Sequence, residues 1–177
     1  MRRVAFFCLA FLVAVIPAAS TLADTSGSNA NESGQLFESS IRGALKAKGF
    51  VVVPYSEWAQ NKQDYEHVAR LALRNVPYRS IYGHDARVEF LLKAKELDRD
   101  ILIQGMRQSR PGSVDEKLPY VWHNARLNYP ERETILIVTG DGWKPGALRW
   151  AREQMAATEG FSVMSLEEFL SWAGQAF

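Results

Sequence analysis

The chain has 177 residues, of which 47% are hydrophobic and 23% are charged. This length suits one globular domain with its own core and excludes two comfortable domains. The formal net charge of +1 excludes a global positive field that would attract nucleic acid, so any such binding must rest on a local patch.

The first 23 residues predict a secretory signal peptide, 1–23. Arg2 and Arg3 precede an apolar run over 4–16, and small residues lead to a cleavage pattern that ends at Ala23. The run is too short for a stable transmembrane helix, so we expect no stable membrane span after cleavage; an uncleaved anchor is the rival interpretation. The signal predicts a secreted or periplasmic protein, or a cytoplasmic one if the start of the chain is wrongly assigned.

Cleavage would leave a mature chain without cysteine, because Cys8, the only one, lies in the signal. That excludes disulfides, a thiolate nucleophile and a cysteine-based metal site. Loss of Arg2 and Arg3 lowers the basic count from 21 to 19 against 20 acids, which gives a net charge near −1.

The segment 24–34, DTSGSNANESG, predicts a flexible linker ahead of a domain over 35–177, because it is rich in Ser, Asn and Gly. In that domain, apolar residues at helical spacing predict a first helix that ends at Gly49, a glycine suited to a left-handed terminator. A short buried strand follows over 51–53. The next helix is expected over 65–73.

Further strands are predicted by apolar alternation and by turn signals, over 78–82, 87–92, 100–107, 134–139 and 161–164. Capping boxes at Ser113 with Glu116 and at Ser165 with Glu168 predict two helix starts. The first of these helices contains Pro119, which can kink it.

Pro145 opens a further helix at its first position. The resulting order, α-β-(α)-β-β-β-α-β-α-β-α, predicts an α/β fold with a mixed central β-sheet flanked by helices.

Strand alternation predicts which polar side chains share a face of this sheet. Glu89 lies on the strand over 87–92, and Gln104 and Met106 share one face of the strand over 100–107. If the two strands pair, Glu89 comes beside Gln104. A lone charge such as Glu89 in a hydrophobic strand should be paired, metal-bound or exposed.

Several segments carry a family resemblance, namely GQLFESSIRGALKAKGF, NVPYRSIYG, RVEFLL, DRDILIQGMRQ, GSVDEKLPYVW, TILIVTGDGWKPGALRW and VMSLEEFLSWA. Together they resemble the PD-(D/E)xK nuclease superfamily, and more narrowly its restriction-endonuclease-like members of bacteria and phages. The likeness covers about residues 34–177. It implies a restriction-endonuclease-like αβββαβ core, which agrees with the order of elements read from the residues.

The resemblance implies a site of two carboxylates and one lysine that hydrolyses phosphodiesters with Mg²⁺. An acid on the second core strand and a glutamate on the third hold the metal, and a lysine two residues later helps orient or deprotonate the attacking water. Carried over to this chain, the second-strand acid is Glu89. A helix glutamate that helps hold the metal is Glu38, which as a bare helical position would be exposed. The implied metal ligands are thus Glu38, Glu89 and Gln104.

The E-x-K motif falls on Gln104-Gly105-Met106 and is degenerate. Gln104 offers only a neutral oxygen, and Met106, at the position of the expected lysine, can carry no charge. Losing one electrostatic stabiliser commonly costs about 10²–10³ in rate, and here a metal carboxylate is lost as well. The resemblance therefore implies the fold and favours an inactive domain over an active one.

Several basic residues are candidates for other roles in such a site. Lys117, on the helix after the motif, is a candidate replacement base, as is Lys144, although each is better explained as a solvated surface charge. Arg107, Arg110 and Lys144 are candidate contacts to DNA phosphates. Gln108 matches a polar residue that the family carries just after its lysine, and it can serve the structure alone.

Three hypotheses follow from the sequence. The first is an exported member of the superfamily with a decayed site, a pseudo-nuclease that acts as a binding module. The second is an active Mg²⁺-dependent DNA endonuclease that uses Glu38, Glu89, Gln104 and a relocated basic residue. The third is that the signal is an artefact and the domain works on DNA in the cytoplasm. The sequence gives no DNA target, partner or oligomeric state.

Overall fold

The structure, a computed structural model, describes residues 25–131 and 133–177; the signal peptide predicted over 1–23 lies outside them. The strands of the sheet are β1 (Val51–Pro54), β2 (Arg70–Arg79), β3 (Asp85–Ala94), β4 (Ile101–Arg107), β5 (Glu133–Thr139) and β6 (Phe161–Met164). The α-helices are α1 (Thr25–Ala47), α2 (Tyr55–Gln60), α3 (Leu118–Leu127), α4 (Pro145–Trp150) and α5 (Leu166–Ala176). Short helical turns are η1 (Lys62–Tyr65), η2 (Val114–Lys117) and η3 (Ala151–Met155).

The six strands form one mixed sheet in the order β1-β2-β3-β4-β5-β6. The pairs β2–β3 and β3–β4 are antiparallel, whereas β1–β2, β4–β5 and β5–β6 are parallel. A parallel pair needs a crossover, and α3 and α4 supply those after β4 and β5. The predicted α/β fold with a mixed sheet flanked by helices is confirmed.

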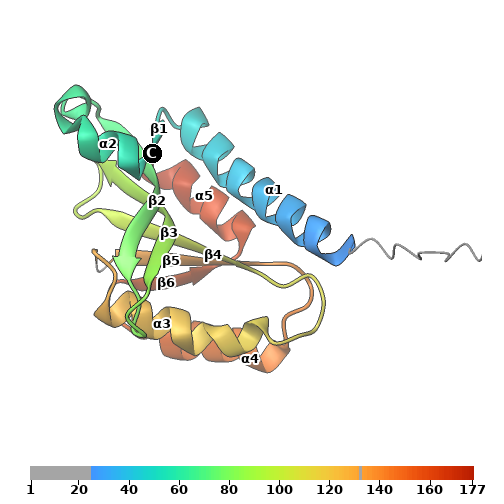
Figure 1. Ribbon diagram of the computed structural model, residues 1–177. Coiled ribbons are helices and arrows are strands. Elements are labelled where there is room, and N and C mark those ends of the chain that lie inside the picture. The colour runs from blue at the N-terminus through green and yellow to red at the C-terminus, as the bar shows by residue number, and fades with distance from the viewer. Residues whose placement is uncertain (1–24, 132) are drawn as a thin grey trace, which may run out of the picture.

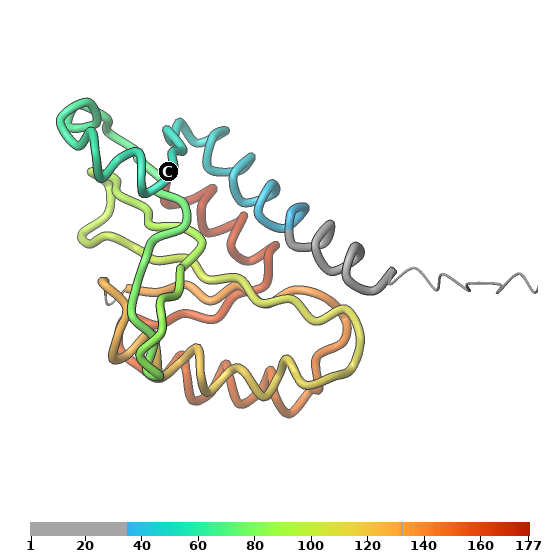
Figure 2. The backbone as a smooth tube through the Cα atoms, viewed as in Figure 1, coloured from blue at the N-terminus to red at the C-terminus, as the bar shows by residue number. Residues whose placement is uncertain are grey.

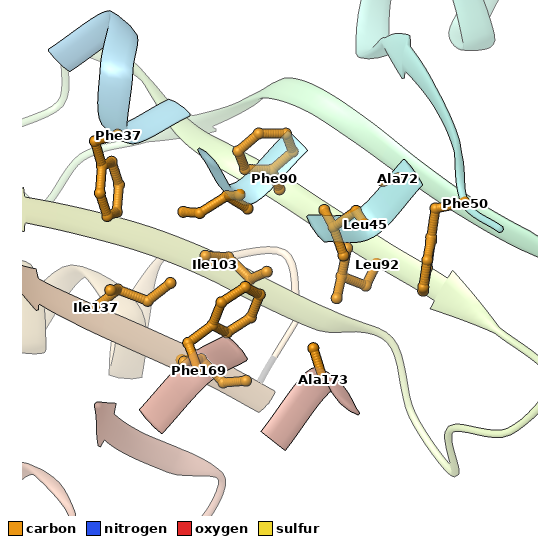
Figure 3. Packing of buried hydrophobic residues seen from close by; sticks show 12 residues of the cluster. Phe37, Leu45, Phe50, Ala72, Phe90, Leu92, Ile103, Ile137, Phe169 and Ala173 are labelled. Atoms are coloured by element: carbon orange, nitrogen blue, oxygen red, sulfur yellow. The ribbon is translucent and has the colours of Figure 1, made fainter. Parts of the chain in front are cut away.

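Helices cover both faces of this sheet (Figure 1). On one face, α1 and α5 lie side by side and bury an apolar cluster against β2 to β5. Figure 3 shows Phe37 and Leu45 of α1, and Phe169 and Ala173 of α5, directed toward sheet residues such as Phe90. Burying a side chain of this size contributes about 1.5–3 kcal/mol, so this cluster fixes α1 on the sheet.

On the opposite face, α3 and α4 cover β4, β5 and β6. A second cluster lies there, and it includes Met106, Leu118, Leu136, Val138 and Met155. A third cluster packs β2 and β3 against α2 and η1, with Leu73, Val88 and Leu102 among its members. None of the helices in residues 25–131 and 133–177 is long and apolar enough to cross a membrane.

The bounds of α1, Thr25–Ala47, include part of the segment for which composition predicts a linker. One prediction about the first third of the chain is wrong. The helix expected over 65–73 is absent, because the chain from Arg70 pairs with β1 on one side and β3 on the other. The helix between β1 and β2 is instead α2, which precedes this segment. Tertiary pairing thus overrides a pattern that also suits a helix.

The capping box predicted at Ser113 and Glu116 is not formed, since the Ser113 side chain caps nothing. Pro119 lies in the first turn of α3, where a missing N–H is harmless, so it does not kink the helix. The second box is confirmed: the Ser165 hydroxyl accepts the Glu168 backbone N–H at 3.1 Å, and the Glu168 carboxylate accepts the Ser165 N–H at 2.6 Å. Gly49 ends the first helix at a φ of 80°, as predicted.

Candidate functional site

The predicted site lies where the β3–β4 ladder ends. The two strands pair at Phe90–Ile103 and at the two positions beyond it toward the end of β3. Glu89 is the next residue on β3 and Gln104 the next on β4, so the two residues follow the last paired position on neighbouring strands. Figure 1 shows the β2–β3 hairpin turning toward α3, while β4 continues beside β5. We call this divergence of β3 from β4 the fork.

Glu89 closes the fork by a hydrogen bond. Its carboxylate accepts the backbone N–H of Gly105, which has no β3 carbonyl opposite it. Burial raises the pKa of Glu89 to about 7, the Gly105 N–H opposes this rise, and the nearby charge of Glu38 adds to it. Near neutral pH, Glu89 is thus protonated for much of the time, which weakens it as a metal ligand.

Gln104 has protein partners for both ends of its amide. Its Oε1 accepts the Tyr129 hydroxyl at 3.3 Å, and its Nε2 donates to the Gly105 carbonyl at 3.2 Å. Burial raises the pKa of Tyr129, so this phenol remains a neutral donor. The Tyr129 ring packs edge-on against Tyr78 with 4.8 Å between centroids. A neutral network therefore surrounds the position where the family implies a metal-binding glutamate.

Met106 lies in the hydrophobic cluster beneath α3 and α4 and is 8% exposed. It shares a face of β4 with Gln104, as alternation predicts, but its side chain packs against apolar neighbours such as Leu118 and Val138. A lysine at this position would have to carry its charge out of that cluster. The position of the expected lysine is therefore part of the core.

Glu38 reaches the same region from α1. The preceding residue, Phe37, lies over Gly105 so closely that a Cβ at that glycine would be 2.0 Å from the Phe37 ring. This contact holds α1 above β4. Glu38 does not stand free: its Oε1 is 3.0 Å from Nε of Arg74, which lies opposite Phe90 on β2. Arg74 escaped the sequence analysis, because it lies between the helix expected over 65–73 and the strand expected over 78–82, and it was assigned to neither.

The residues at the fork do not fit a divalent metal ion. Mg²⁺ prefers several hard, anionic oxygens in octahedral geometry. Here Glu38 is paired with Arg74, Glu89 is bonded to Gly105, and Gln104 is neutral. Within the part of the chain that the structure describes, no three His, Cys, Asp or Glu side chains are grouped so that they could hold a metal. The metal set implied by the family is incomplete in this chain.

A buried polar clamp lies beyond the fork, at the carboxyl ends of β4 and β5. The amide of Gln108, 3% exposed, donates to the Gly142 carbonyl at 2.7 Å and accepts the Asp115 N–H at 3.2 Å. Burial alone would raise the pKa of Asp115, but the bonds from Lys144 and Gln108 leave it lowered. Lys144 Nζ is 3.1 Å from Asp115 Oδ2. Gln108 therefore has the structural role that the sequence allowed.

The clamp joins two loops that run together in Figure 2, those after β4 and after β5. Both glycines of the second loop need their lack of a side chain. A Cβ at Gly140 would lie 2.5 Å from the Gln108 carbonyl oxygen, and one at Gly142 would lie 2.4 Å from the Arg110 backbone. Close packing of the two loops therefore brings Arg110 and Lys144 to one end of the sheet.

The predicted basic residues gather at this end rather than at the fork. Arg107 and Arg110 are exposed, and Arg107 Nε donates to Ser109 Oγ at 2.9 Å. Lys117 is exposed on η2. In residues 25–131 and 133–177, Lys117 makes no ion pair, and Lys144 pairs with Asp115 of the clamp.

Comparison with known families agrees with this geometry. The family description that matches is the PD-(D/E)XK nuclease superfamily domain, over residues 29–177. No curated protein and no solved structure gave a significant match.

The state of Glu89 predicts a pH dependence of stability. The pKa is about 7 in the folded chain against an ordinary 4.5, so the folded state binds the proton more tightly. This contribution is fully present below pH 4.5 and is lost as the pH rises through 7. Glu89→Gln stays neutral and can still accept the Gly105 N–H. Urea unfolding should show the wild type losing about 2–3 kcal/mol relative to this variant between pH 4 and pH 8.

Glu96→Gln is a control with the opposite sign. The hydrogen bond from Arg70 lowers the pKa of Glu96, so its contribution to stability is lost as the pH falls. Parallel pH profiles for the wild type and Glu89→Gln would contradict the buried, neutral state of Glu89.

Proposed function

The chain belongs to the PD-(D/E)XK nuclease superfamily, and from this premise we propose that it is an exported member that has lost efficient phosphodiester hydrolysis and acts as a DNA-binding module. The observation that carries the proposal is Met106, which fills the position of the catalytic lysine with a core side chain. Gln104 supports the same proposal. At the position of a metal-binding carboxylate it has a neutral amide, which is hydrogen-bonded to Tyr129 and Gly105.

The missing charged groups at the fork should slow phosphodiester hydrolysis strongly. The cleavage reaction of the superfamily needs a cation set that activates water and offsets charge on the phosphorane. One missing electrostatic stabiliser typically costs about 10²–10³ in rate. This chain lacks the lysine, one metal carboxylate and the full charge of Glu89, so we propose that chemistry fails while the fold is kept.

Binding to DNA is supported by the basic end of the sheet. Arg110 and Lys144 come from two loops that the polar clamp fixes together, and Arg107 is the last residue of β4, just before the first of these loops. Arg107 follows Gln104 by three residues, about 10 Å along the strand, so a backbone lying across the fork would reach it. Contacts of this kind position a nucleic acid without reading its sequence.

The first prediction of this proposal concerns cleavage. With Mg²⁺ or Mn²⁺, the purified protein should cut plasmid DNA no faster than its Glu89→Ala variant. The variant Gln104→Glu/Met106→Lys restores both missing groups, so cleavage by that variant alone would assign the loss to these positions. Cleavage by the wild type that disappears in Glu89→Ala would contradict the proposal and favour an active metal-dependent endonuclease.

The second prediction concerns binding without metal. Fluorescence anisotropy with a labelled DNA duplex in EDTA should give saturable binding that weakens with salt, as phosphate contacts require. Arg107→Gln/Arg110→Gln should weaken it by about tenfold, because two phosphate contacts are lost. Arg152→Gln is the matched control, since Arg152 pairs with Glu168 on η3 and α5, outside the basic end. Equal losses in both variants would count against a site at the two loops.

Export is the third part of the proposal, and it rests on residues 1–23 alone. We expect the protein recovered from its native cells to begin near residue 24 and to be found outside the cytoplasm. N-terminal sequencing of the fractionated protein decides this: an intact N-terminus in the cytoplasmic fraction would contradict export and favour a domain that meets DNA inside the cell.

A further inference from the structure

We propose that the guanidinium of Arg74 takes the place at the fork that a metal ion has in the superfamily. It pairs with Glu38 and so keeps divalent metal ions from binding there. This inference rests on the proposed loss of metal-dependent cleavage and gives that loss a second cause besides Gln104 and Met106. Nothing in the E-x-K motif points to Arg74, because it lies on a different strand.

The geometry places Arg74 directly at the site. It lies on β2 opposite Phe90, the neighbour of Glu89 on β3. Its Nε is shielded from solvent and lies 3.0 Å from Glu38 Oε1. The two groups meet as an ion pair without the alignment of a hydrogen bond, so charge rather than direction holds them. The side chain thus occupies the space beside the carboxylate that a metal ion would need.

The charge count at the fork is consistent with this substitution. The family pattern sets three carboxylates against one lysine and one divalent metal, three charges of each sign. In this chain Glu38 and Glu89 remain, and Arg74 supplies one positive charge. Glu38 is neutralised by Arg74, so an incoming dication would meet a single carboxylate that already accepts a backbone N–H. A divalent ion gains little there and would also be repelled by the guanidinium.

Lack of access does not explain the exclusion of metal. The Glu38 side chain is 37% exposed and borders a groove of about 670 Å³ between α1 and β2. The lining of this groove is formed by Gln35, Leu36, Glu38, Ser39, Arg42 and Arg74. An ion can therefore reach Glu38 from solvent. The positive charge already present, and not a steric barrier, is what a metal would have to displace.

Metal binding by variants tests this inference without any activity assay. Mn²⁺ binding is measured by calorimetry and by loss of the free-ion EPR signal, for the wild type, Gln104→Glu and Arg74→Gln/Gln104→Glu. We expect no specific Mn²⁺ binding by the wild type and weak binding at most by Gln104→Glu. The double variant should bind one Mn²⁺ at least about tenfold more tightly than Gln104→Glu, because a repelling charge is gone.

The chain offers a closely matched control in Arg70, four residues earlier on β2. Its ion pair with Glu96 has side-chain exposures of 25% and 39%, against 27% and 37% for Arg74 and Glu38. Arg70→Gln/Gln104→Glu should therefore bind Mn²⁺ no better than Gln104→Glu. The variant Arg74→Lys/Gln104→Glu keeps the positive charge and should also stay metal-free. Circular dichroism of each variant confirms that it is folded.

Each remaining outcome overturns the inference. Gln104→Glu binding as tightly as Arg74→Gln/Gln104→Glu would mean that Arg74 excludes nothing. A folded Arg74→Gln/Gln104→Glu that binds no Mn²⁺ would mean that the fork lacks a metal site for other reasons. Tight binding by the wild type would also overturn it. Plasmid cleavage by the wild type bears instead on the proposed function, so failure of one proposal is distinguishable from failure of the other.

Discussion

The hydrogen bond between the Glu89 carboxylate and the Gly105 N–H is the constraint on which the fork depends. A buried backbone donor must find an acceptor, and the β3–β4 ladder ends before it can supply one to Gly105. The carboxylate takes that place and joins the two strands where they diverge. The same glycine lets Phe37 bring α1 down onto β4. The acid that the family uses for metal is thus also needed to complete the backbone.

This dual use explains how the other changes at the fork fit together. With Met106 in the lower core and Gln104 held by Tyr129, neither position offers charge to a metal. Glu38 would then face solvent and Glu89 without a counter-charge, and like charges near one another raise the cost of ionisation. Arg74 supplies a counter-charge to Glu38, while the charge of Glu38 still adds to the raised pKa of Glu89. At the fork, Glu38 is thus paired with Arg74, and Glu89 accepts the Gly105 N–H, without a metal ion.

Much of the fork could be predicted from local pattern, because strand alternation is a two-residue period that needs no partner to be seen. It predicted Glu89 beside Gln104, and in the structure these residues directly follow the last paired position of β3 and β4, Phe90–Ile103. What failed required long-range information. The segment from Arg70 is compatible with a helix in isolation, and only its pairing with β1 and β3 makes it a strand. Arg74 lies just beyond the expected helix and was given no role, since a cation there matters to the site only once β2 is known to pair with the strand that carries Glu89.

The polar clamp is intact in this chain, whereas the E-x-K motif is degenerate, and the two depend on different interactions. Metal-dependent hydrolysis in the superfamily depends on charged groups, and Gln104 and Met106 carry no charge. The clamp depends on hydrogen bonds to the buried Gln108 and Asp115. Loss of any partner would leave a buried polar group without a hydrogen bond, which destabilises the fold. The loops that carry Arg110 and Lys144 are held by these buried bonds, none of which involves Gln104 or Met106. The arrangement of the two loops is therefore independent of the charges at the fork.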